Sequence, residues 1–179
     1  MKKSLLIFAI SLLGMLSCTK NDTVVSPKQT DVYVAGYDGD GNTYKAKIWK
    51  NGVATTLTNG STEAFANAVF VSGNDVYVCG YESTAVENIA KLWKNGVATA
   101  LTNGTNTARP NKIVVAGSDV YVAGYEANAA GKSVAKLWKN GVATSLTDGT
   151  NNAEANSIFV SGNDVYVAGY ESNGTKLIA

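Results

Sequence analysis

The feature that most constrains the fold is a nine-residue stretch that the chain contains three times. "KLWKNGVAT" occupies Lys91–Thr99 and Lys136–Thr144, and "KIWKNGVAT" occupies Lys47–Thr55. A second motif, "DVYV", begins at four aspartates spaced 44, 44 and 45 residues apart: Asp31, Asp75, Asp119 and Asp164. A period of this length, filled with strand-like segments and without apolar residues at helical spacing, predicts β-propeller blades rather than helical repeats.

Each copy of the repeat divides into four short strands. In the copy that shows this best, the expected strands are Ala66–Ser72, Asp75–Tyr81, Ala90–Lys94 and Val97–Thr102. Gly73-Asn74 joins the first pair and Asn95-Gly96 joins the last, and both dipeptides favour two-residue hairpin loops. The sequence therefore predicts an all-β fold of four-stranded antiparallel blades, with about 44 residues per repeat.

The residue pattern also predicts which strands are covered. "VYVAG" is apolar on both faces, as in a strand between two sheets, whereas "VATTLT" suits a wetter outer strand. The repeats occupy residues 31–74, 75–118 and 119–163, with a partial copy at 164–179. The last residue of the partial copy aligns with Ala90, which directly precedes "KLWKNG" in a complete copy. We therefore expect an incomplete propeller, either part of a longer chain or completed by self-association through open blade edges.

The first 30 residues differ from the rest. "MKKS" precedes the 12-residue apolar run Leu5–Leu16, which is typical of a signal peptide over residues 1–17. "MLSC" then resembles the lipobox of bacterial lipoproteins. The resemblance implies a lipidated Cys18 at the mature N-terminus, a polar tether over residues 18–30 and an extracytoplasmic, membrane-anchored protein. Thr19 follows Cys18, and the absence of Asp there favours the outer membrane. The alternative is an ordinary signal peptide with an incidental cysteine.

A second resemblance covers about a dozen residues of each copy. "SGNDVYVAGYE" at Ser161–Glu171, with variants beginning at Ser72 and Ala116, resembles the bacterial β-propeller repeat family abbreviated SBBP. The "KLWKNG" hairpin is more similar to uncharacterised secreted proteins of the Bacteroidetes type. The resemblance implies a propeller and an extracytoplasmic location, and it implies no single activity.

Composition excludes several functional classes. The chain has no histidine, so Ser-His-Asp, Cys-His and histidine–zinc sites are impossible within it. Its net charge is +1 and Arg109 is its single arginine, which argues against nucleic-acid binding. The acidic residues of "DVYV" and those after each Gly-Tyr recur in every copy, so we assign them to turns rather than to catalysis. We expect no enzyme activity and no cofactor.

Three kinds of candidate site remain. Trp49, Trp93 and Trp138 are candidates for stacking on sugar rings, although packing between blades is the favoured interpretation. "DGDGN" offers Asp38, Asp40 and Asn42 as the start of a calcium loop, but it lacks the downstream bidentate acid, so a solvated turn is favoured. Cys79 replaces an alanine of the other copies and is expected to be a buried thiol.

The loops that differ between copies are polar and rich in Asn, Thr and Gly, as binding loops on a rigid scaffold often are. Together these observations predict a cell-envelope lipoprotein with a propeller domain that binds a glycan or another envelope protein. The alternatives are the scaffold part of a larger extracytoplasmic enzyme, with catalytic residues beyond Ala179, and a purely structural array.

Overall fold

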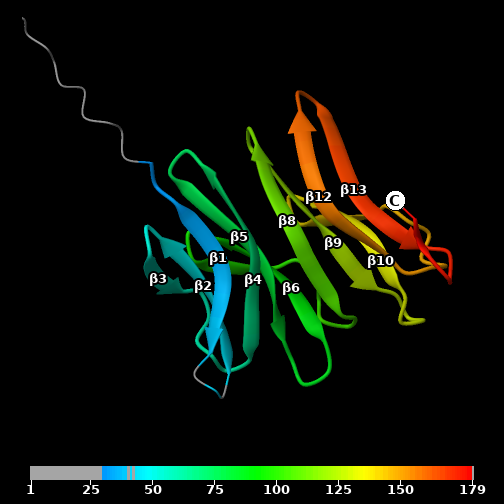
Figure 1. Ribbon diagram of the computed structural model, residues 1–179, viewed down its shortest axis with the longest axis horizontal. Coiled ribbons are helices and arrows are strands. Elements are labelled where there is room, and N and C mark those ends of the chain that lie inside the picture. Colours follow the sequence, from blue (N-terminus) through cyan, green and yellow to red (C-terminus); the bar gives the residue numbers. More distant parts are fainter. Residues whose placement is uncertain (1–29, 40, 42, 179) are drawn as a thin grey trace, which may run out of the picture. The chain divides into compact units, whose positions relative to one another are not determined.

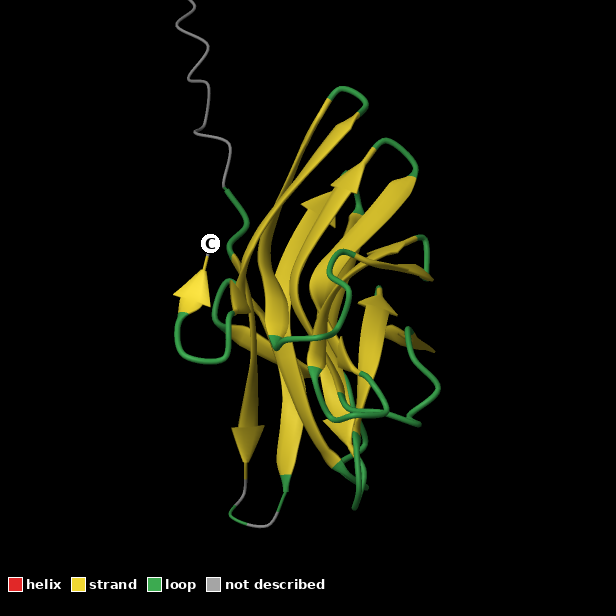
Figure 2. Ribbon diagram, turned by 90° about the vertical axis from the view of Figure 1, so that its right-hand side faces the viewer, coloured by secondary structure: helices red, strands yellow, loops and turns green. Residues whose placement is uncertain are grey.

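The computed structural model describes residues 30–39, 41 and 43–178. Every regular element within these residues is a strand, and the 14 strands form four antiparallel sheets (Figures 1 and 2). We number these sheets I to IV in chain order. The all-β prediction is therefore confirmed.

Each sheet is a meander in which consecutive strands pair. Sheet I contains β1 (Tyr33–Gly39), β2 (Tyr44–Lys50) and β3 (Val53–Thr56). Sheet II contains β4 (Glu63–Ser72), β5 (Asp75–Ser83), β6 (Asn88–Lys94) and β7 (Val97–Ala100). Sheet III contains β8 (Ala108–Ala116), β9 (Asp119–Ala127), β10 (Ser133–Lys139) and β11 (Val142–Ser145). Sheet IV contains β12 (Ala153–Ser161), β13 (Asp164–Ser172) and the short β14 (Leu177–Ile178).

The sheets pack in sequence order. Strands β1 and β2 contact β4, the strands β4 to β6 contact β8, and β8 to β10 contact β12, as the succession of colours in Figure 1 shows. Among the described residues this series of sheets is open and does not close into a ring.

The repeated nine-residue stretch forms the hairpin that joins the last two strands of sheets I, II and III. Asn51, Asn95 and Asn140 each have φ of 51°, and the glycines that follow have φ of 82° to 84°. Two consecutive residues with positive φ define a type I′ turn, which fits the twist of the paired strands and favours Asn-Gly. The predicted hairpin is confirmed in all three copies.

A bulge recurs in the first strand of sheets II, III and IV. The register shifts at Asn67, Asn111 and Asn156, which have no partner in the next strand. Two of these asparagines reach the following sheet. Asn67 donates its Nδ2 hydrogen to the Pro110 carbonyl at 2.6 Å, and Asn111 donates likewise to the Ala155 carbonyl at 3.1 Å. The bulged asparagine therefore ties one sheet to the next.

A glycine lies opposite the bulge. A Cβ atom on Gly80, Gly124 or Gly169 would lie 1.9, 2.2 or 2.0 Å from a carbonyl oxygen of the first strand. The atoms that the added Cβ would meet belong to the backbone of the first strand, which cannot move aside without separating the two paired strands. Glycine in the recurring "Gly-Tyr" is therefore required by the close approach of two strands.

The core consists of three layers, one between each pair of neighbouring sheets. Strands β5 and β9 are buried or half-buried along their whole length, whereas β3, β7 and β11 are exposed at every position. Both observations agree with the residue pattern. Strand β13 is more exposed because sheet IV has a neighbour on one side only among the described residues.

Candidate functional site

The structure buries two of the three tryptophans proposed for ligand stacking. Trp93 and Trp138 have no exposed surface, and their rings pack between sheets I and II and between sheets II and III. A ring that has no exposed face cannot stack on a sugar, so these two indoles are packing groups, which was the favoured interpretation, and are not ligand-stacking groups. Trp49 is half-buried.

The other candidates lie partly outside the described residues. Cys18 is among residues 1–29, and Asp40 and Asn42 of the proposed calcium loop are also outside the described part. Asp38 is described, and its Oδ2 lies 2.7 Å from the Nζ of Lys47. Within the described residues, no three His, Cys, Asp or Glu side chains are placed to hold a metal ion.

The aspartates of "DVYV" tie two hairpins together. Asp75 Oδ1 accepts a hydrogen bond from Asn95 Nδ2 at 2.7 Å, and Asp75 Oδ2 lies 2.8 Å from Lys94 Nζ. Asn95 Oδ1 in turn accepts from the Val76 amide at 2.8 Å. The same contacts occur in the triads Asp31/Lys50/Asn51 and Asp119/Lys139/Asn140. Each aspartate thus holds the neighbouring hairpin and not only its own turn.

These triads make a testable contribution to stability at low pH. Hydrogen bonds from the lysine and the asparagine lower the pKa of Asp31, Asp75 and Asp119. A lowered pKa means that the stabilisation is present above the ordinary Asp pKa of about 3.9 and is lost as pH falls through the folded-state value. The triple Asp→Asn variant should therefore show a smaller loss of stability between about pH 4 and pH 2.

Urea unfolding followed by circular dichroism across this pH range measures the effect. Asp164→Asn is the matched control, because the Asp164 side chain makes no hydrogen bond or ion pair among the described residues. A triple variant with the same pH slope as the control would contradict the contribution of the triads.

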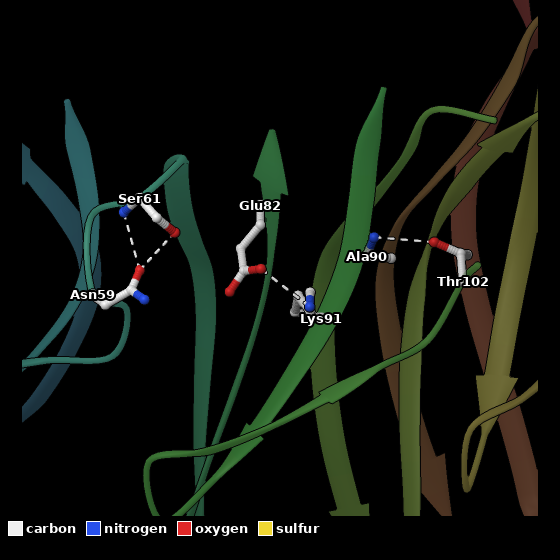
Figure 3. A network of polar contacts seen from close by, with 6 residues as sticks. All are labelled: Asn59, Ser61, Glu82, Ala90, Lys91 and Thr102. Carbon is white, nitrogen blue, oxygen red and sulfur yellow. Dashed lines mark hydrogen bonds and ion pairs between the residues drawn. The ribbon is translucent and has the colours of Figure 1, made fainter. Parts of the chain in front are cut away.

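The acidic residues after Gly-Tyr are also paired. Glu82 Oε2 lies 3.1 Å from Lys91 Nζ on the adjacent strand (Figure 3), and Glu126 and Lys136 make the equivalent contact at 3.6 Å. Figure 3 also shows two contacts made by residues of the connecting loops, one within a loop and one to strand β6. Asn59 Oδ1 accepts from the Ser61 amide at 3.0 Å, and Thr102 Oγ1 accepts from the Ala90 amide at 3.1 Å. The polar groups of these side chains are therefore paired within the protein, which indicates a structural role.

Cys79 is a buried thiol, as predicted. Burial raises its pKa to about 12, since desolvation disfavours the thiolate. In a Cys18→Ala variant Cys79 is the remaining cysteine. It should not react with a disulfide reagent at pH 8 in the native state and should react fully in urea, because the thiolate is the nucleophile. Absorbance of the released thiolate measures this, and rapid reaction of the native protein would contradict the burial.

The strongest candidate site is a row of tyrosines that sequence reasoning missed. Each sheet contributes one tyrosine that directly follows a glycine. These tyrosines lie on β1, β5, β9 and β13 and are Tyr37, Tyr81, Tyr125 and Tyr170. All four rings keep part of their surface exposed. The residues paired with the last three differ between sheets and are Phe65, Arg109 and Glu154. We call these seven residues the tyrosine ladder.

Contacts along the ladder run from sheet to sheet. The Phe65 ring lies 4.7 Å from Tyr37 and stacks on Tyr81 at 4.9 Å, measured between ring centroids. The Arg109 guanidinium then lies 4.8 Å from the centre of the Tyr81 ring. Such cation–π contacts hold the guanidinium against the face of the ring.

Neighbouring polar groups orient Arg109. When the Asn88 amide oxygen faces Arg109, it accepts from Nε and Nη2 at 3.0 Å, and Asn88 Nδ2 donates to Ser83 at 2.6 Å. Burial raises the pKa of Tyr81 and of Tyr125, and the positive charge of Arg109 opposes that rise. The two phenols therefore remain protonated at neutral pH and can both donate and accept hydrogen bonds.

The far end of the ladder carries one acidic residue, Glu154. Burial, followed by a hydrogen bond with the Glu154 carboxylate, raises the pKa of Tyr170. The ladder thus offers partly exposed aromatic rings, one guanidinium and one carboxylate within a single row. The signal available in the sequence was a tyrosine that recurs in every copy opposite a residue that varies.

Comparison of the chain with protein-family models and with curated proteins finds no match. The described part of the chain has no helix of the length and apolar character needed to span a membrane.

Proposed function

We propose that this chain is a cell-envelope lipoprotein whose four sheets are blades of a β-propeller, and that the tyrosine ladder binds a glycan. The observation that carries the glycan proposal is the row of partly exposed rings interleaved with Arg109 and Glu154. Aromatic faces cover the apolar C–H surfaces of sugar rings, and a few fixed polar groups orient the hydroxyls.

Two observations support the propeller and the anchor. Meander sheets stack face to face with a 44-residue period, and the bulged asparagines repeat the same contact between successive sheets. Consecutive propeller blades are stacked in this way, which supports the proposal. The apolar run before Ser17-Cys18 supports lipidation of Cys18.

A glycan array followed by calorimetry tests the binding site. The full chain should bind at least one array glycan, and Tyr81→Ala and Arg109→Ala should each weaken binding about tenfold, about 1.4 kcal/mol. Tyr166→Ala is the control, because Tyr166 is 57% exposed and lies outside the ladder. Thermal unfolding verifies that each variant is folded. An array without hits, or equal affinity in all variants, would contradict the proposal.

Membrane fractionation tests the anchor separately. Cys18→Ala should move the protein from the membrane fraction to the soluble fraction, because the acyl chains provide the attachment. A variant that stays with the membrane would refute lipidation of Cys18.

A further inference from the structure

Arg109 is an exposed cation that has no carboxylate partner among the described residues. It lies at the second position of β8, where sheet III meets sheet II, and is the single arginine of the chain. A guanidinium stays charged throughout the pH range in which proteins are folded. A fixed surface cation without a counter-ion is a place where an anionic group can bind.

The acidic side chains around Arg109 do not neutralise it. The glutamates that follow Gly-Tyr in sheets II and III are paired with lysines. Glu87, in the loop after β5, accepts a hydrogen bond from Thr107, and Glu154 hydrogen-bonds with the tyrosine of its own sheet. Glu63 is exposed at the start of β4 and forms no ion pair with Arg109 in the part of the chain that the structure describes.

Two contacts hold the guanidinium in one orientation. Its Cζ lies 4.8 Å from the centre of the Tyr81 ring, and the Asn88 amide oxygen accepts from its Nε and Nη2 at 3.0 Å. Asn88 is itself fixed, because its Nδ2 donates to Ser83 at 2.6 Å and its backbone amide donates to Thr107 Oγ1 at 3.3 Å. A cation that is held in place before binding loses less conformational freedom when a ligand arrives.

The donors that remain on Arg109 suit a carboxylate. A guanidinium carries five N–H groups, and the Asn88 oxygen takes one on Nε and one on Nη2. Arg109 makes no other hydrogen bond within residues 30–39, 41 and 43–178. The parallel N–H groups at the end of the fork, one on Nη1 and one on Nη2, therefore remain, and their spacing matches the two oxygens of a carboxylate.

This arrangement occurs in one copy of the repeat. Phe65 in sheet II and Glu154 in sheet IV hold the position that Arg109 holds in sheet III. In sheet III the position of Asn88 is held by Ser133. Residues that build the fold recur in each copy, whereas a group that orients a ligand is needed at one place. Its single occurrence therefore indicates a role in binding.

The neighbouring positions determine how an acidic ligand would lie on the ladder. On one side of Arg109, Phe65 stacks on Tyr81 with 4.9 Å between ring centroids and an interplanar angle of 25°. On the other side, the equivalent position carries the negative charge of Glu154. Since like charges repel, the ligand's anionic group lies at Arg109 and its uncharged part extends toward Phe65.

We propose that the glycan bound by the tyrosine ladder is acidic, and that Arg109 binds the carboxylate of one of its sugars, a uronic or a sialic acid. This inference rests on the proposed glycan binding. The carboxylate accepts one hydrogen bond from Nη1 and one from Nη2, and the adjoining sugars contact the aromatic rings of sheet II.

Calorimetry with matched oligosaccharides tests the charge of the ligand on the full chain. The probes are array glycans that contain a uronic or sialic acid, the same glycans with the carboxylate reduced to an alcohol, and forms with a sulfate ester instead. The best binder should carry a carboxylate, and its reduction should weaken binding at least about tenfold.

Variants of Arg109 test its role. Arg109→Gln should weaken binding of the carboxylated glycan about tenfold and change that of the reduced form by less than about twofold. Arg109→Lys keeps the charge but not the paired N–H groups, so it should restore only part of the affinity. Lys112→Gln is the matched control, because it removes the same charge from an exposed residue of β8 outside the ladder and should leave affinity unchanged.

The outcomes separate this inference from the proposed function. Neutral glycans that bind as well as acidic ones, with binding still weakened in Tyr81→Ala, would overturn the acidic ligand and leave the glycan site in place. An array without hits would overturn both. Preference for the sulfated form would overturn the assignment to a carboxylate. Equal losses in Arg109→Gln and Lys112→Gln would show an effect of net charge and overturn the role of the guanidinium.

Discussion

Gly124→Ala is expected to lower the free energy of unfolding by about 3 kcal/mol, at the upper end of the range for overpacking. The added Cβ would lie 2.2 Å from the Arg109 carbonyl oxygen and 2.8 Å from the Pro110 Cα. Both atoms belong to the backbone of β8 at its bulge, so relief requires β8 and β9 to separate. The lost free energy includes that of backbone hydrogen bonds between β8 and β9.

Gly36→Ala is the matched control for this variant. Gly36 holds the equivalent position in sheet I, where its added Cβ meets Trp49 Cζ3 at 3.1 Å. A side chain can shift by a few tenths of an ångström, so the control should lose much less stability. Urea unfolding followed by circular dichroism compares the two. Similar losses would show that the bulge is not the cause.

Trp138→Ala should lower the free energy of unfolding by about 3–5 kcal/mol, because it removes a fully buried ring between two sheets. The cavity left by the ring cannot collapse readily, since the strands around it are held in place by backbone hydrogen bonds to their neighbours. Trp138→Phe should cost clearly less. It keeps an aromatic ring, and it removes an Nε1 hydrogen-bond donor that has no partner among the described residues.

Trp49→Ala is the comparison for the tryptophan series. Trp49 occupies the same repeat position but is half-buried, so its loss should be well below that of Trp138→Ala. Chemical denaturation of the three variants gives the free energies. Equal losses at Trp49 and Trp138 would contradict the inference that packing between two sheets sets the cost.

Local signals made much of the fold predictable. Asn-Gly determines its own turn through the positive φ of Asn95 and Gly96, and the apolar residues of "DVYV" indicate a strand covered on both faces. Neither inference requires knowledge of the neighbouring sheet. Strand pairing within each repeat followed from these signals alone.

The candidate site was not predictable in the same way, because it depends on contacts between sheets. Nothing near Asn67 in the sequence marks a bulge that reaches Pro110, 43 residues away. The contact of Arg109 with Tyr81 likewise joins two sheets. The repetition of the tryptophans in the sequence was compatible with both packing and an exposed row, and the favoured interpretation, packing, is the one that the buried Trp93 and Trp138 show.

The two identical hairpins have a consequence for how the chain reaches its native state. Since β6–β7 and β10–β11 carry the same nine residues and the same turn, the hairpin itself does not distinguish the two sheets. The sheet that each hairpin joins is therefore determined by the connections Thr84–Glu87 and Asn128–Lys132, which link each hairpin to the strand before it. Closing a short loop costs less entropy than closing a long one, so each hairpin finds its own sheet first. Lengthening either connection should therefore promote exchange of hairpins between molecules during refolding at high concentration.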